Sequence, residues 1–188
     1  VRPKLVSAGG VPIITIANMK GGVGKSTVSA NLAWHFCGRA NWSKKVLAAD
    51  LDPQFNLSQY ILGVHSYDNV VVKGNNPTMW DIFEQNTRAP GIKARGKSLS
   101  DCIVKRVKYH DGAQLDLIPS QLQLSSTLKN PSQKEHLLST FMSKCEKDYD
   151  VIFVDCAPTE SVLTVAAYLA CDWILIPVKP EFLCTIGL

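Results

Sequence analysis

The run "IANMKGGVGKST", residues 16 to 27, concentrates residue types that suit phosphate binding. Its glycines remove side chains from the path along which a phosphate would approach backbone N–H groups, and Lys25 supplies a cation. A helix that begins at Lys25 would direct its free N–H groups and its positive dipole end at the anion. Ser26 would place a hydroxyl on Mg²⁺, and Thr27 could reach an inner phosphate. The three glycines are Gly21, Gly22 and Gly24.

The loop departs from the usual phosphate-binding pattern at its first position. That pattern is G-x-x-x-x-G-K-[ST], and counting back from Gly24 puts Met19 where the first glycine is expected, followed by Lys20. The residues alone leave two interpretations of Lys20 open: a solvated surface lysine, or a second cation that serves the phosphates. An apolar run before the loop and a helical pattern after it support the phosphate site itself.

Three aspartates also follow apolar runs. Asp155 comes after "VIFV", where a carboxylate can hold Mg²⁺ through the metal's water shell. Asp50 and Asp52, in "AADLDPQFN", point the same way along an extended backbone because they are two residues apart. One could support the metal while the other orients an attacking water. A single aspartate at a strand end is more often a cap or turn residue, so the combination with the glycine loop is what favours catalysis.

Short apolar runs alternate with helix-like stretches along the chain, and this alternation must position those side chains. It predicts an α/β fold with a mostly parallel sheet covered by helices on both faces. The polar motifs then fall at the carboxyl ends of strands, where such sheets hold their ligands. Strands are predicted at residues 11–18, 44–50, 115–120, 149–158 and 172–180, and helices at 25–40, 122–148 with a break near Pro131, and 161–171. The apolar face of the first helix carries Val28, Leu32 and Phe36.

Length and composition indicate one globular domain over residues 1–188. The chain is 46% hydrophobic and 19% charged, which is ordinary for a folded soluble protein and excludes a disordered or fibrous one. No run reaches the roughly 18 uninterrupted apolar residues of a membrane span. The basic and apolar N-terminus leads directly into the glycine loop, so we interpret it as a buried strand instead of a signal peptide. The sequence stops at "PEFLCTIGL" as a helix begins, and we expect that C-terminal structure is missing.

The cysteines and the charge distribution give weaker signals. No pair of cysteines has a C-x-x-C spacing, so we expect packed, reduced thiols in a cytoplasmic protein; they are Cys37, Cys102, Cys145, Cys156, Cys171 and Cys184. Residues 88–108 hold seven basic residues and one acid, a local charge of +6 that leaves −2 for the rest of the +4 total. This segment could bind nucleic acid, but its Gly and Pro content favours a mobile surface loop.

Several motifs together resemble one family. "KGGVGKST", "DLDPQFNLS", "VDCAP", "LDLIPS" and "ILIPVKPEFLCTIGL" are similar to those of the deviant Walker A ATPases of the ParA/Soj partition group, in the class that includes MinD and the nitrogenase iron protein. The resemblance runs from about Ile13 to Leu188. It implies a P-loop NTPase fold of ParA/CbiA-like type that uses ATP and Mg²⁺.

The resemblance also implies roles for individual residues. Lys20 would reach across a nucleotide-sandwich dimer to the partner's ATP, much as an arginine finger does in trans, and Asp52 would position the hydrolytic water. Asp155 would be the Walker B carboxylate. The expected catalytic residues are Lys20, Lys25 and Asp52, and those of the metal site are Ser26, Asp50 and Asp155. The expected ATP-binding residues are Lys20, Gly21, Gly22, Val23, Gly24, Lys25, Ser26 and Thr27.

The function implied is an ATP-dependent switch in plasmid or chromosome partitioning. It would dimerise on ATP, bind DNA without sequence preference in the cytoplasm at the nucleoid, and hydrolyse ATP slowly under the control of a ParB-like partner. Alternatives are a MinD-like ATPase at a membrane, an iron–sulfur or electron-transfer relative that would need cysteines such as Cys102 or Cys156, and an ATP-dependent biosynthetic ligase. Phe55 departs from the family, which usually has glycine there, and the family's adenine- and DNA-contacting residues lie mostly beyond Leu188.

Overall fold

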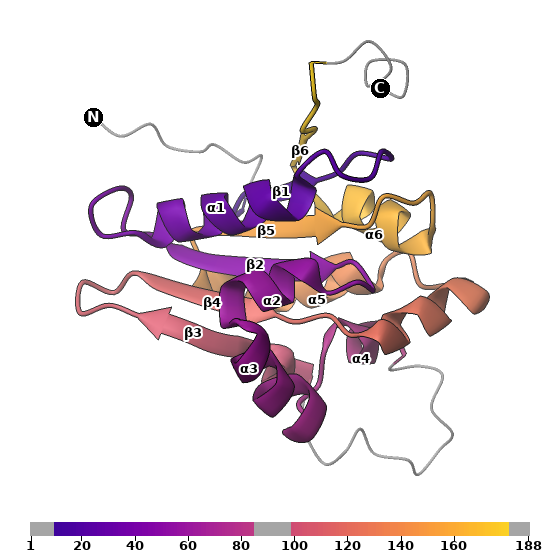
Figure 1. Cartoon of the computed structure of the whole chain (residues 1–188), viewed down its shortest axis with the longest axis horizontal. Coiled ribbons are helices and arrows are strands. Elements are labelled where there is room, and N and C mark those ends of the chain that lie inside the picture. The colour runs from indigo at the N-terminus through magenta and orange to yellow at the C-terminus, as the bar shows by residue number, and fades with distance from the viewer. Residues whose placement is uncertain (1–9, 85–98, 181–188) are drawn as a thin grey trace.

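The order of the strands decides which loops of this chain meet. The computed structural model describes residues 10–84 and 99–180. Within that part of the chain, six strands form one sheet in the order β3-β4-β2-β5-β1-β6 (Figure 1). All neighbouring strands are parallel except the antiparallel β3 and β4, which confirms the predicted mostly parallel sheet. The strands are β1 (Ile13–Ile16), β2 (Lys45–Leu51), β3 (Val104–Lys108), β4 (Gln114–Ile118), β5 (Val151–Cys156) and β6 (Trp173–Leu175).

Helices cover both faces of this sheet, as predicted. One face packs against α1 (Lys25–Cys37), α2 (Asn56–Leu62) and α3 (Val64–Tyr67). The opposite face packs against α4 (Met79–Phe83), α5 (Leu137–Cys145) and α6 (Val162–Ala170). Figure 1 shows α5 behind the strands. The described residues also form shorter helical segments: a π-helix η1 (Asp68–Lys73) and 3-10 helices η2 (Leu99–Cys102), η3 (Leu122–Lys129) and η4 (Glu146–Asp148).

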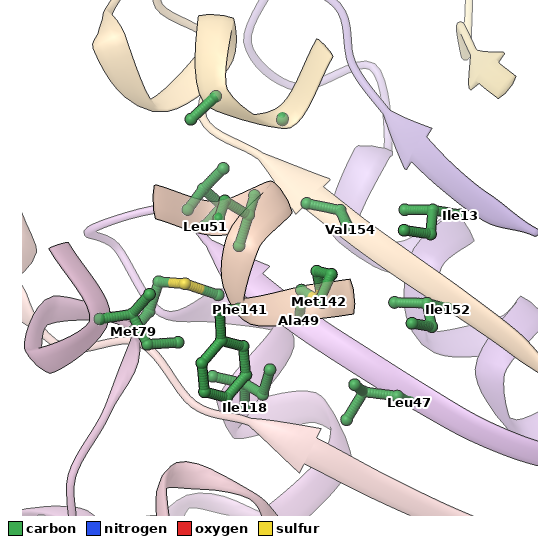
Figure 2. Packing of buried hydrophobic residues seen from close by; sticks show 14 of the residues in the cluster. Ile13, Leu47, Ala49, Leu51, Met79, Ile118, Phe141, Met142, Ile152 and Val154 are labelled. Carbon is green, nitrogen blue, oxygen red and sulfur yellow. The ribbon is translucent and has the colours of Figure 1, made fainter. Parts of the chain in front are cut away.

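The central strand β5 is buried along its whole length because both of its faces carry helices. Figure 2 shows one of the two cores, where Leu47 and Ile152 from the sheet lie near Met142 of α5. On the other face Phe153 packs edge-on against Phe36 of α1, with ring centroids 5.4 Å apart. This two-sided burial explains why "VIFVDC" is apolar without alternation.

The buried stripe of α1 differs from the prediction. Val28, Leu32 and Phe36 are only partly buried, whereas the fully buried positions are small residues and the lysine that starts the helix. Small side chains let the helix backbone approach the sheet closely, and hydrophobic spacing gives them little weight. The buried residues of α1 are Lys25, Ser29, Ala30, Ala33 and Cys37.

Other segments depart from the predicted elements in length or type. The last predicted strand, 172–180, is a strand only over Trp173–Leu175, and the first half of 122–148 is a 3-10 helix. Residues 104–108 of the basic segment, predicted as a surface loop, form the edge strand β3. Residues 88–98 of that segment lie outside the described residues, and Leu99–Cys102 form η2.

The cysteines of the described residues are free thiols, as predicted. Cys37, Cys102, Cys145 and Cys156 are buried, and Cys171 is partly buried. Burial raises the pKa of the Cys102 and Cys156 thiols, which keeps them protonated and unreactive. Cys184 lies outside the described residues.

Replacing Phe153 tests the packing of α1 on the sheet. Phe153→Ala should lower the free energy of unfolding by about 3–5 kcal/mol, because it removes a buried ring and leaves a cavity. Urea unfolding measures the change, with Tyr168→Ala, at a half-exposed position on α6, as the matched control. A loss below about 1 kcal/mol for Phe153→Ala would show that this core does not hold α1 in place.

Candidate phosphate-binding site

The glycine loop joins β1 to α1 in a conformation that needs glycine. Gly22 and Gly24 have φ values of 71° and 91°, a left-handed region that other residues rarely adopt. A Cβ added at Gly21, Gly22 or Gly24 would meet no atom within 4 Å, so the loop lines open space. Gly24 is also the N-cap of α1 and provides no capping side chain, which leaves the first N–H groups of the helix available to an anion.

Lys25 lies inside this loop, with only 7% of its surface exposed. Its ammonium group donates to the carbonyl oxygens of Asn18 at 2.9 Å and of Lys20 at 3.0 Å. Burial lowers the pKa of Lys25, while the negative charges of Asp155 and Asp52 act in the opposite direction. The loop therefore holds a cation beside two carboxylates.

Lys20 is exposed, and its backbone is fixed on both sides. Its N–H donates to Oδ1 of Asn18 at 2.8 Å, and its carbonyl accepts the bond from Lys25. The Asn18 amide in turn donates to the carbonyl of Pro177 at 2.9 Å. Asn18 thus ties the loop to the segment after β6 and holds the backbone from which the Lys20 side chain extends.

Asp50 and Asp155 are brought together by strand pairing, because they are directly opposite each other on β2 and β5. Both are fully buried. Asp50 accepts bonds from the N–H and hydroxyl of Ser58 at 2.8 and 2.6 Å and from the N–H of Asp52 at 3.1 Å. Asp155 accepts one bond, from Ser29 at 2.8 Å, and its second carboxylate oxygen is buried without a partner.

Both carboxyl groups have a raised pKa. Burial, together with the charge of Asp155, raises the pKa of Asp50 to about 8. Burial raises the pKa of Asp155 to about 6, although the hydroxyls of Ser26 and Ser29 and the charge of Lys25 oppose that rise. One pKa unit corresponds to about 1.4 kcal/mol, so ionising Asp155 costs the folded chain about 3 kcal/mol. A cation beside these oxygens would remove that cost.

Asp52 begins a tight turn at the end of β2. It is buried, and its carboxylate accepts the N–H of Gln54 at 2.9 Å while its carbonyl accepts that of Phe55. Phe55 has φ 48° and ψ 30°, a left-handed conformation that costs a non-glycine residue about 1–2 kcal/mol. Its ring stacks on Tyr67 with centroids 5.0 Å apart. This stacking offsets about 0.5–1.5 kcal/mol of the conformational cost. Phenylalanine thus takes the backbone shape in which glycine was expected.

A cavity of about 390 Å³ opens between the glycine loop and this turn. The structure brings most of the predicted residues to its wall. Four are outside its lining: Lys20, which is exposed, and Val23, Asp50 and Asp155, which are buried. The lining residues are Gly21, Gly22, Gly24, Lys25, Ser26, Thr27, Asp52, Gln54, Asn56, Tyr60 and Pro158.

Sequence reasoning missed the residues that hold the carboxylates in place. Ser29 is one helical turn after Lys25, and a polar residue on the sheet-facing side of α1 was the available signal. Ser58 connects Asp50 to the exit of β4, since its hydroxyl also accepts the N–H of Ser120 at 2.9 Å. No local pattern marks that contact, because it joins residues 62 positions apart.

These residues fit a phosphate chain accompanied by a divalent cation. The glycine loop offers N–H donors and a lysine, which suit phosphate oxygens. Below it, the buried carboxylate oxygen of Asp155 has no partner, and the hydroxyl of Ser26 lies close enough to lower the pKa of that residue. The described residues contain no group of three His, Cys, Asp or Glu side chains that could hold a metal by themselves. Mg²⁺ suits such a site because it keeps several waters and takes ligands from phosphates.

The sequence matches the AAA domain family over residues 11–188. It is 31% identical over 179 residues to the sporulation initiation inhibitor protein Soj of Bacillus subtilis, covering 94% of this chain and 61% of Soj. The structure is similar to a plasmid partition protein of Borrelia burgdorferi bound to AMPPNP, with a TM-score of 0.74, 28% identity, and coverage of 95% and 67%.

A third similarity is to an enzyme. Cobyrinic acid a,c-diamide synthase of Mycobacterium smegmatis, bound to an ATP analogue and magnesium, matches with a TM-score of 0.69 and 25% identity over 92% of this chain and 60% of the synthase. The chain spans about three fifths of the length of the curated relatives it matches.

The raised pKa of Asp50 predicts a pH dependence of stability in the metal-free chain. The folded state holds a proton at Asp50 up to about pH 8, whereas the unfolded state releases it near pH 4. Folding therefore loses stability as pH rises from about 4 to 8. Asp50→Asn removes this term, so the variant should gain stability relative to the parent chain between pH 5 and 8. Urea unfolding in the presence of a chelator measures the free energy of unfolding of both chains. If the value for the variant minus that for the parent stays constant or falls as pH rises, the assignment is contradicted.

Proposed function

We propose, from the premise that this chain belongs to the AAA domain family in its ParA-type group, that it is an ATP-dependent molecular switch. It binds ATP with Mg²⁺, pairs with a second copy of itself and hydrolyses ATP slowly. The observation that carries this proposal is the buried Lys25 in its glycine loop, facing the carboxylates at the ends of β2 and β5. Residues 1–188 would act as one ATPase domain in this role.

The glycine loop and the start of α1 would bind the triphosphate. Lys25 would release the carbonyls of Asn18 and Lys20 and turn its ammonium group to the outer phosphates. Ser26 and Asp155 would hold Mg²⁺, with Asp50 supporting the metal's water shell from beneath. When bound, Mg²⁺ supplies the positive charge that neutralises the phosphates and the buried carboxylates.

Hydrolysis would depend on positioning a water molecule. Asp52 lines the cavity and is fixed by the turn that ends at Phe55, so its carboxylate can orient a water without a large rearrangement. Lys20 would contribute from the partner copy, because its backbone is anchored while the residue is exposed. A cation supplied in trans couples hydrolysis to dimerisation.

The similarity to Soj and to a plasmid partition protein favours a role in DNA partitioning. In that role the dimer binds DNA without sequence preference in the cytoplasm at the nucleoid, and a ParB-like protein on the DNA stimulates hydrolysis. The phosphates of DNA would be met by basic side chains, so this binding weakens steeply as salt increases.

The alternatives find different support. The similarity to a diamide synthase keeps an ATP-dependent biosynthetic enzyme as a second candidate, which would need a small-molecule acceptor besides ATP. An iron–sulfur relative would need cysteines that pair across a dimer, and Cys102 and Cys156 are both buried. A MinD-like protein would need an amphipathic helix that lies on the membrane surface, and this alternative stays open. None of the described helices has the length and apolar character to cross a bilayer.

Replacing Lys25 tests the phosphate site. Lys25→Ala should weaken binding of AMP-PNP with Mg²⁺ by about 100-fold, because charge-assisted bonds to phosphate are lost. Calorimetric titration measures the change, and circular dichroism confirms that the variant folds. Lys129→Ala, at an exposed position on η3, serves as the control. Equal affinity in the two variants would contradict the assigned role of Lys25.

Replacing Lys20 separates nucleotide binding from dimerisation. Lys20→Ala should bind AMP-PNP nearly as tightly as the parent chain but sediment as a monomer, whereas the parent chain sediments as a dimer. With duplex DNA added, only the parent chain with AMP-PNP should co-sediment, and not with ADP. A variant that dimerises normally would exclude a role in trans, and DNA binding that ignores the nucleotide would exclude the switch.

A further inference from the structure

The edge strand β3 carries three basic residues that a bulge divides between the two faces of the sheet. Arg106 is the extra residue of the bulge. It faces α1 and α2, where its Nε donates to the carbonyl of Ile61 at 2.9 Å and its guanidinium lies 5.9 Å from the centroid of the Trp34 ring. On a regular strand, residues three apart face opposite sides. Because the bulge inserts one residue, Lys105 and Lys108 instead share the opposite face.

The register adds a third lysine from inside the sheet. Lys108 pairs with Gln114 of β4, and Gln114 pairs with Lys45 of β2, so the three residues form one row across three strands. Side chains in such a row begin about 5 Å apart. Lysines on an edge strand can serve only to prevent pairing with other chains. That explanation does not cover Lys45, which lies two strands in from the edge.

These side chains frame a cavity of about 350 Å³. It lies at the end of the sheet where β2 begins, about 16 Å along that strand from Asp50, at 3.3 Å per residue. The three lysines are exposed, and within the described residues none of their ammonium groups has a hydrogen-bond or ion-pair partner. Their positive charges are therefore available to a ligand.

The wall of the cavity is polar and organised. Tyr149 donates its hydroxyl to Asp116 at 2.8 Å, and the Gln114 amide donates to the same oxygen at 3.3 Å. Asp116 and Tyr149 are both buried. Burial raises the pKa of Asp116, and the Tyr149 hydrogen bond and the charges of Lys105 and Lys108 oppose that rise. Asp148 is the other acid of the lining and is exposed. The three lysines therefore outnumber the carboxylates around an ordered polar surface.

We propose that the cavity framed by Lys45, Lys105 and Lys108 is a second anion site that binds phosphate groups, at the end of the sheet opposite the glycine loop. Three lysines that line one cavity suit an anion with at least two negative charges, and phosphate is such an anion near neutral pH. The ligand is either a small phosphate compound or a phosphate of a nucleic-acid backbone. The site does not require that the glycine loop binds ATP.

Titration with pyrophosphate, followed by the backbone amide signals of the ¹⁵N-labelled chain, tests the proposal. The amides of Lys105, Lys108 and Gln114 should shift and saturate. In the double variant Lys105→Gln/Lys108→Gln, the pyrophosphate concentration at half-saturation should rise by about tenfold or more, because two charge-assisted bonds are lost. Residues 20–27 report separately on the glycine loop in the same spectra, so failure of one site is distinguishable from failure of the other.

The matched control is Lys129→Gln, which removes one exposed lysine far along the chain from this cavity and should leave the titration unchanged. The proposal is overturned if the shifts are confined to residues 20–27, if the double variant titrates like the control, or if sodium chloride of equal ionic strength produces the same shifts. Since each variant keeps the buried Asp116–Tyr149 pair, both should fold, and their spectra verify it.

A second arm identifies the source of the phosphate. A short DNA duplex is titrated into the same labelled chain at two salt concentrations. Saturation by pyrophosphate alone indicates a small phosphate ligand. Shifts of the same amides by the duplex, lost in the double variant and weakened by salt, indicate a nucleic-acid backbone. The absence of shifts at these amides in both arms excludes the site.

Discussion

Two carboxyl groups buried at the ends of adjacent strands are the constraint on which the rest of the site depends. Asp50 and Asp155 face each other across β2 and β5, out of contact with solvent, and Asp52 follows two residues later. Burial raises the pKa of both groups, and a neighbouring carboxylate adds to the rise in each case: Asp155 for Asp50, and Asp52 for Asp155. The ionised site is therefore destabilised. The positive charge of Lys25 and the hydroxyls of Ser29 and Ser58 stabilise the carboxyl groups. The glycine loop leaves open space in which a cation and phosphates could bind.

The same constraint explains the sheet order. Placing β5 between β2 and β1 brings the carboxylates of two strands beneath the loop that leaves the third. Helices on both faces exclude water from β5. Ionising a carboxyl group there costs free energy, and a bound cation would lower that cost. The opposite end of the sheet is built differently: its lysines are exposed, and a bulge in β3 places Lys105 and Lys108 on the same face. One sheet thereby separates a buried acidic end from an exposed basic end.

Much of this arrangement could be predicted from local patterns. The glycine loop, the apolar β5 and the aspartates after strands are each encoded within a few neighbouring residues. The stripe of α1 that packs on the sheet could not be predicted from hydrophobicity, because alanine, serine and cysteine fill it. The contacts of Ser29 and Ser58, the left-handed Phe55 and the bulge at Arg106 depend on partners distant in sequence or on backbone register. The role of Lys20 depends on a second copy of the chain.

The central claim is that buried carboxylates make phosphate binding at the glycine loop depend on a divalent cation. Calorimetric titration of AMP-PNP into the parent chain, with Mg²⁺ and then with a chelator, tests it most directly. The account predicts that affinity falls by about tenfold or more without Mg²⁺, because the carboxylates then repel the triphosphate at close range. Equal affinity with and without Mg²⁺ would contradict it.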